Sequence, residues 1–213
     1  MKKAVVTLET TATLTFSQDI SHHPKNPGEK PDEFDQRLFR KKAYDRTGTV
    51  YLKASAIMNS IIDGAKQLKE RIQGKGMATV GGLFERGGIL VEDDISLGVR
   101  VADLIETPVF VNADGRGSGK RVVRRFPEIE KGVRFTVPVF VLNDEITREQ
   151  FEKAVRSAGM FIGVGQHFPQ NRGTHGRFKL VDLKWIENWT GEEEIVGPRR
   201  TSSVGQASAR ARR

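Results

Sequence analysis

The feature that most constrains the fold is the order in which strand-like and helix-like patterns follow one another. Residues 4–16 are rich in β-branched residues with apolar side chains on alternate positions, and predict a strand that is long or bent. Residues 133–142 and 177–186 predict two further strands. Apolar residues recur at helical spacing over 55–72 and again over 147–158. This order of strand, helix, strand, helix and strand predicts an α+β domain.

Local signals place some of the element boundaries. Ser55 is the expected N-cap of the first helix, and Thr147, followed by Gln150, is expected to open the second. Pro138 lies inside the strand predicted over 133–142. Because proline has no backbone N–H to donate to a sheet, it favours an edge position or a bulge.

Two segments interrupt the succession of predicted strands and helices, and a third segment follows it. We expect one domain over residues 1–190, with insertions at 17–45 and 74–130. Of the formal net charge of +8, from 35 Lys and Arg against 27 Asp and Glu, five charges are arginines in the acid-free stretch Pro198–Arg213. Because large apolar residues are scarce there, we expect the tail at 191–213 to be disordered when free. The tail is expected either to attract polyanions or to act only as a solubilising terminus.

The composition excludes several classes of chemistry. The chain has no cysteine, which excludes disulfides, thiolate metal sites and a cysteine nucleophile, and its four histidines offer little for a metal centre. No apolar run of roughly 18 residues is present, so we expect no membrane span. The basic N-terminus lacks the apolar segment of a signal peptide, which predicts a cytoplasmic protein. We expect no cofactor and no metal.

A basic segment follows the glycine-rich residues 113–119. If it is extended, its side chains alternate between two faces and do not form one clean stripe. Such residues either contact a phosphate backbone or belong to a solvated loop. The residues singled out are Lys120, Arg121, Arg124, Arg125 and Phe126.

The most informative segment is the glycine-rich stretch 161–178. Its glycines permit close backbone approach, so that N–H groups and polar side chains together predict a cradle for phosphates. The residues concerned are Gly163, Gly165, His167, Arg172, Gly173, His175, Gly176 and Arg177. The segment follows a predicted helix and opens a strand, whereas a dinucleotide-binding loop follows a strand and opens a helix.

The same segment resembles the closing glycine-rich loop of the RAMP superfamily, the RNA-binding subunits and processing nucleases of CRISPR systems. The likeness depends on 163–165 and 173–178, and on a strand, turn and helix over 50–66, and it covers about half of the chain. It implies a ferredoxin-like (RRM-like) antiparallel sheet with two main helices and large insertions. It also implies binding of single-stranded RNA, often in head-to-tail assemblies. Residues 163–178 also resemble uncharacterised proteins of tailed-phage genomes.

Three functions fit these patterns. The first is non-catalytic binding of single-stranded RNA or DNA, with Phe126 and Phe168 as candidates for stacking on bases. An oligomer of the protein that coats the strand is one form of this function. The second is a metal-independent endoribonuclease, for which His22, His23, His167 and His175 are available. The third is a structural protein whose basic surface meets an acidic protein partner. We favour the first function, and we name no catalytic residue.

Overall fold

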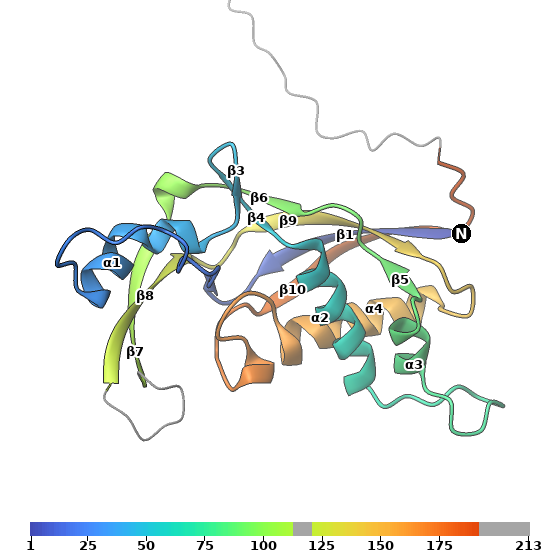
Figure 1. Cartoon of the computed structure of the whole chain (residues 1–213). Coiled ribbons are helices and arrows are strands. Elements are labelled where there is room, and N and C mark those ends of the chain that lie inside the picture. Colours follow the sequence, from blue (N-terminus) through green and yellow to red (C-terminus); the bar gives the residue numbers. More distant parts are fainter. Residues whose placement is uncertain (113–120, 192–213) are drawn as a thin grey trace, which may run out of the picture.

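A computed structural model describes residues 1–112 and 121–191 of the chain (Figure 1). The expectations for Lys120, for residues 113–119 and for the tail at 192–213 lie outside these described residues. The strands are β1 (Lys2–Thr10), β2 (Leu14–Thr15), β3 (Asp45–Arg46), β4 (Thr49–Leu52), β5 (Ile89–Leu90), β6 (Ile95–Arg100), β7 (Ile105–Asn112), β8 (Arg121–Ile129), β9 (Arg134–Val141) and β10 (Phe178–Ile186). The helices are α1 (Pro31–Leu38), α2 (Ala54–Gln67), α3 (Val80–Glu85) and α4 (Arg148–Ser157), with shorter turns η1 (Phe39–Lys42), η2 (Val101–Asp103), η3 (Ala158–Ile162) and η4 (Pro169–Asn171).

The central sheet has the strand order β10-β1-β9-β5, and all of its neighbouring strands are antiparallel. Helix α2 connects β1 to the β5 edge, and α4 connects β9 to β10, and both helices lie on the same face of the sheet (Figure 1). Numbered along the chain, the four strands lie in the order 4-1-3-2, which is that of a ferredoxin-like fold. The predicted fold class, α+β with two main helices, is therefore confirmed.

The core lies between the central sheet and these helices. On β1 the buried side chains alternate, and Ala4, Val6 and Leu8 are fully covered. Ile61 of α2 and Phe151 of α4 are also fully buried in the same apolar cluster. The apolar side chains that alternate along the strand and those at helical spacing are thus buried in the same core.

The two main helices begin in different ways. Thr147 caps α4 as predicted, accepting from the Gln150 N–H at 3.2 Å while the Gln150 side chain accepts from the Thr147 N–H at 3.0 Å. The prediction of Ser55 as the N-cap of α2 is wrong. Lys53 occupies that position, and the Asp94 carboxylate accepts from the Ala54 N–H at 2.9 Å. A residue 40 positions away therefore supplies the acceptor that a local cap usually provides.

Pro138 lies within β9, which is an interior strand of the central sheet. Strand β9 pairs with β1 along its whole length but with β5 only at Phe140 and Val141. At Pro138, where Val5 is its partner in β1, the far side of β9 has no hydrogen-bonded neighbour among the described strands. On that side of β9 no ladder bond depends on a donor at Pro138, so the local environment there is that of an edge.

Two small sheets complete the described fold. One has the order β2-β8-β7 and includes a long β7–β8 hairpin that projects from the body, and the other has the order β3-β4-β6 (Figure 1). Helix α1, from the segment 17–45, packs against β8, and its Phe34 and Leu38 form a separate cluster with Ile20, which precedes the helix. None of the helices in the described ranges is long and apolar enough to cross a membrane.

Candidate nucleic-acid interface

The glycine-rich loop runs from η3 to β10 and lies between the main helices and the β7–β8 hairpin (orange in Figure 1). Much of its backbone is bonded within the protein. The N–H groups of Gln166 and Gly176 donate to the carbonyls of Thr15 and Thr13, both at 2.7 Å, and the Val164 N–H donates to the Gly176 carbonyl at 3.0 Å. These donors are not available to a phosphate. The polar surface that the loop offers is mainly one of side chains.

Close packing inside the loop explains two of its glycines. A Cβ on Gly176 would lie 1.8 Å from the Val164 carbonyl oxygen, and its φ of +70° is in the left-handed region. A Cβ on Gly173 would lie 1.7 Å from the His167 carbonyl oxygen. Only glycine fits either position without moving the backbone. Gly163 and Gly176 are buried, and Gly165 and Gly173 are half-buried.

Two predicted histidines and Phe126 come together at this loop. The His167 ring lies 5.9 Å from the His175 ring and 5.0 Å from the Phe126 ring, measured between centroids. Neither Nδ1 atom is exposed to solvent or has a hydrogen-bond partner among the described residues. Burial, and secondly His175, lowers the pKa of His167. The two rings therefore pack together within the loop, and burial disfavours the charged form of His167.

The two arginines of the loop remain at the surface. Arg172 and Arg177 are exposed, and neither has an ion-pair partner within residues 1–112 and 121–191. Arg172 adopts a left-handed φ of 62° directly after η4, and its N–H donates to the Pro169 carbonyl at 2.9 Å. The predicted cations of this loop are thus free to meet an anion.

The predicted basic residues of β8 have different environments. Arg121 is exposed. The Arg124 side chain is 44% exposed and lies 3.4 Å from the Asp35 carboxylate, whereas Arg125 is only 19% exposed and is bound by Asp32, at 3.0 Å, and by Glu106. Arg121 and Arg124 are therefore open to a ligand, while Arg125 holds the hairpin to α1. Sequence alone did not separate these two roles.

Neither of the two aromatic side chains predicted for stacking, Phe126 and Phe168, is exposed. Phe126 is only 8% exposed, with its ring contacted by His167 and by the Lys42 ammonium at 4.8 Å. Phe110, across the hairpin on β7, is 69% exposed and pairs with Val123. The alternation along β7 directs Phe110 away from the body. Phe168 is half-buried.

A second aromatic and cationic group was not predicted. The rings of Tyr44 and Tyr51 lie 5.9 Å apart, and the Lys53 ammonium lies 5.1 Å from the centroid of each. The Arg46 guanidinium lies 5.0 Å from the Tyr51 ring. A hydrogen bond to the Tyr51 hydroxyl and the charge of Asp94 raise the pKa of Lys53, so its ammonium is charged at neutral pH.

Three hollows lie in series beside these groups. The Tyr51 hollow, of about 290 Å³, is lined by Arg46, Tyr51 and Asp94 among others. The Gln166 hollow, of about 220 Å³, is lined by Tyr44, Lys53, Gly165, Gln166 and Ser17 among others. The Arg124 hollow, of about 620 Å³, includes Ser17, Lys25, Lys42, Arg124 and Phe126. Ser17 lines the last two hollows, and the Tyr44–Tyr51 contact joins the first two. We call this series the track.

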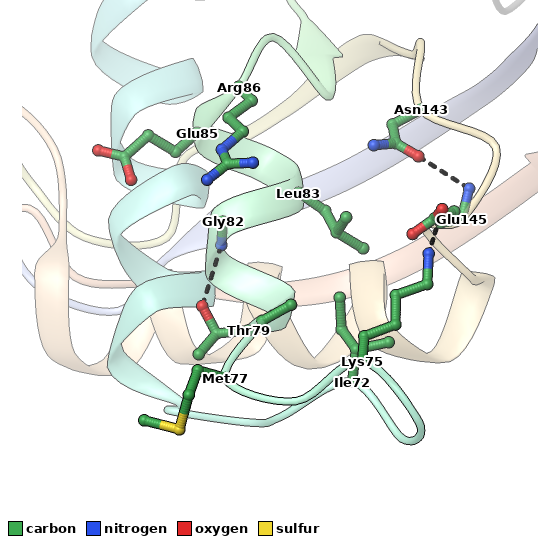
Figure 2. Close-up of a pocket in the computed structure, with 11 residues that line it drawn as sticks. Ile72, Lys75, Met77, Thr79, Gly82, Leu83, Glu85, Arg86, Asn143 and Glu145 are labelled. Carbon is green, nitrogen blue, oxygen red and sulfur yellow. Dashed lines mark hydrogen bonds and ion pairs between the residues drawn. The ribbon is translucent and has the colours of Figure 1, made fainter.

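A further hollow of about 520 Å³ lies at the other end of the helices, between α3 and the residues around Lys75 and Asn143 (Figure 2). Its lining includes Ile72 and Leu83, and its rim carries the ion pair of Lys75 with Glu145 at 2.5 Å. It contains no aromatic residue and none of the predicted site residues. In the described part of the chain, no group of three or more His, Asp or Glu residues is arranged to hold a metal.

No protein-family model matches the sequence, and no curated protein matches it. Among solved structures, the chain is similar to a chain of the type III-B Cmr-beta complex bound to cognate target RNA, with 14% identity, a TM-score of 0.48 and coverage of 87% of this chain. It spans 60% of that chain's length. It is similar to Cmr6 from Pyrococcus furiosus, with 16% identity and a TM-score of 0.44 over 84% of this chain and 99% of Cmr6.

A third similar structure is a type IV-B CRISPR complex, with 11% identity and a TM-score of 0.43 over 94% of this chain and 96% of the matched one. These structural neighbours are RAMP-type CRISPR proteins, the family that the sequence resembles. The fold assignment itself depends on the strand order of the present chain.

Proposed function

We propose that this protein binds single-stranded RNA or DNA along the track and does not cleave it. The observation that carries the proposal is that each of the three hollows combines an aromatic ring with a cation. Tyr51 and Arg46 line the first and Tyr44 and Lys53 the second, whereas in the third Arg124 lies with Phe126, whose ring is largely buried. The half-buried tyrosine rings beside cations suit a single strand, because bases stack on rings while phosphates meet cations.

The hairpin also carries exposed groups outside the track. Phe110 offers an open ring and Arg121 is exposed on the neighbouring strand, and the strand register puts both on the hairpin face opposite to Arg124. Stacking of a base on an aromatic side chain contributes about 1–3 kcal/mol and tolerates any sequence. We therefore expect the stacking contacts themselves to accept any base, and the binding to depend strongly on strand length and salt.

Binding without catalysis is supported by the burial of one ring nitrogen in each loop histidine. The Nδ1 atoms of His167 and His175 are buried and have no hydrogen-bond partner among the described residues. A general acid or base must reach the reacting group, and these two atoms are closed to it. We propose a structural role for the pair inside the loop.

The test is fluorescence anisotropy with labelled single strands of increasing length, and with duplex, at several salt concentrations. Lys53→Ala combined with Arg124→Ala removes one cation from each of two hollows. We expect weaker binding to every sequence and a salt slope that is smaller by about 1.4, since each phosphate contact on a single strand contributes about 0.7. The control is Arg86→Ala with Arg156→Ala, two arginines outside the track.

A second variant examines the loop. Arg172→Ala with Arg177→Ala is expected to weaken binding across all sequences and to flatten the salt slope in the same way. Binding that equals that of the wild type in both double variants would refute the track. Tight binding to duplex alone would also refute it.

The same samples distinguish the other functions. RNA that is cut during incubation would establish the endoribonuclease. Binding that is absent for nucleic acid but present for an acidic protein would establish the interaction protein. We also propose that several copies occupy one strand, in which case the bound stoichiometry rises with strand length. One copy on every length would refute that assembly.

A further inference from the structure

The Arg124 hollow differs from the other two in its size and in its chemistry. Its walls come from residues 17–42 on one side and from β8 on the other, so it exists only because the segment 17–45 packs on the hairpin. Phe34 and Phe126 supply apolar surface, and Lys25 and Arg124 supply cations at the rim. At about 620 Å³ it is more than twice the volume of either neighbour in the track.

Two carboxylates line this hollow, but only one is accessible. Asp35 is 1% exposed, and one of its oxygens is bound by the Lys42 ammonium at 2.9 Å. Asp19 is exposed. Its two oxygens accept from the Ser21 N–H at 2.9 Å and from the Ser21 hydroxyl at 2.8 Å, which orient the carboxylate and leave lone pairs on each oxygen.

The charge of Asp19 is fixed by the same contacts. The Ser21 backbone N–H, followed by its hydroxyl, lowers the pKa of Asp19 below its ordinary value. At neutral pH the side chain is therefore only an acceptor. Facing the edge of a base, it attracts an amino group and repels a carbonyl oxygen.

We propose that the Arg124 hollow receives one base turned out of the bound single strand, and that Asp19 selects cytosine over uracil there. This inference rests on the proposed function. Cytosine presents the N4 amino group, which donates to a carboxylate, whereas uracil presents an oxygen in the same place. Asp19 thus attracts cytosine and repels uracil, and both effects contribute to the selection. The apolar rings and the cations would hold the base and the phosphate beside it, as sites for single-stranded bases commonly do.

The test compares oligocytidine and oligouridine of about 12 nucleotides at neutral pH and about 0.15 M salt, by competition in fluorescence anisotropy. We expect the wild type to bind oligocytidine about tenfold more tightly. In Asp19→Asn the amide can donate or accept, so the ratio is expected to fall to about 2 or less, mainly because oligouridine binds more tightly. Asp182→Asn, an exposed carboxylate on β10, is the charge-matched control and keeps the tenfold ratio.

A ligand-side test does not depend on any variant. Oligocytidine carrying two methyl groups on N4 has no donor there, and we expect it to bind the wild type like oligouridine. Equal affinity of the wild type for all three oligonucleotides, or an unchanged ratio in Asp19→Asn, would overturn the proposed base selection while leaving the track intact. Failure of every oligonucleotide to bind would instead refute the proposed function.

Discussion

Replacing Lys42 by methionine tests how the segment 17–45 is held to the body. Lys42 is 6% exposed, and its ammonium lies 2.9 Å from the Asp35 carboxylate and donates to the Arg125 carbonyl at 2.7 Å. Removing one partner of a buried ion pair costs about 3–5 kcal/mol, because the other charge stays buried. Asp35 keeps weaker contacts to the Arg125 N–H, at 3.3 Å, and to Arg124, at 3.4 Å. We therefore expect a loss of about 3 kcal/mol, at the lower end of that range.

The loss of stability in Lys42→Met is expected to be confined to the segment 17–45. Within the segment, Ile20, Phe34 and Leu38 form a cluster of their own, and Ala43 near its end belongs to the main core. An element with its own small cluster can open without unfolding the rest of the protein. Hydrogen exchange should therefore accelerate over residues 17–42 in Lys42→Met, while exchange in β1 and α4 stays slow. Urea unfolding followed by tryptophan fluorescence reports the global transition for comparison.

Two further variants make the reasoning refutable. Lys42→Met combined with Asp35→Leu removes both charges and is expected to recover most of the protection, since an apolar pair of similar volume replaces the buried ions. Lys66→Met breaks an exposed pair with Glu85, at 2.8 Å, and is expected to change stability by less than about 1 kcal/mol. The argument is wrong if Lys42→Met exchanges like the wild type, or if the double variant is as unprotected as the single one.

Three other changes have defined outcomes. Gly176→Ala meets a backbone oxygen and should cost at least about 3 kcal/mol in urea unfolding. Gly28→Ala, with a similar φ but open space around it, should cost only about 1 kcal/mol, and equal losses would contradict the steric argument. Asp94→Ala removes the acceptor at the start of α2 and should lower the free energy of unfolding by about 1–2 kcal/mol, whereas an unchanged urea midpoint would contradict the capping role. Arg37 lowers the pKa of Glu29 from 4.5 to about 2, so the stabilisation by this pair is fully present above pH 4.5 and is lost as the pH falls towards 2. Arg37→Ala should return the Glu29 pKa towards 4.5 in an NMR titration of the carboxyl group, and a value still near 2 would contradict this.

The main elements of the fold were predictable because their signals are local. Alternation marks β1, β9 and β10, and the Thr147 cap marks α4. Helix α3 was not predicted, because it has only six residues and two of them are glycines, which lower helix propensity. Packing against α2 stabilises it instead. Its formation therefore depends on the tertiary structure and cannot be inferred from the segment alone.

The candidate site was predictable only in part, because its geometry depends on contacts between distant residues. Arg124 and Arg125 are neighbours in sequence, yet the second is neutralised by Asp32, 93 positions away, and by Glu106. Tyr44 directly precedes β3 and Tyr51 lies in β4, and the two rings come together because these strands form a hairpin. The glycine at position 48, with its φ of 79°, was a turn signal that could have suggested this pairing.

The glycine-rich loop illustrates why a motif does not define a mechanism. Glycines in such a segment can free N–H groups for a phosphate, or they can let the chain pack so closely that those N–H groups bond internally, and both outcomes have the same sequence. Here the Gln166 and Gly176 donors are occupied by carbonyls of residues 13–15, and Gly173 and Gly176 fit where no side chain would. The loop therefore forms one wall of the Gln166 hollow. Under the proposed function, exposed side chains such as Arg172 and Arg177 supply its attraction for phosphate, so glycine substitutions in it should impair folding before they impair binding.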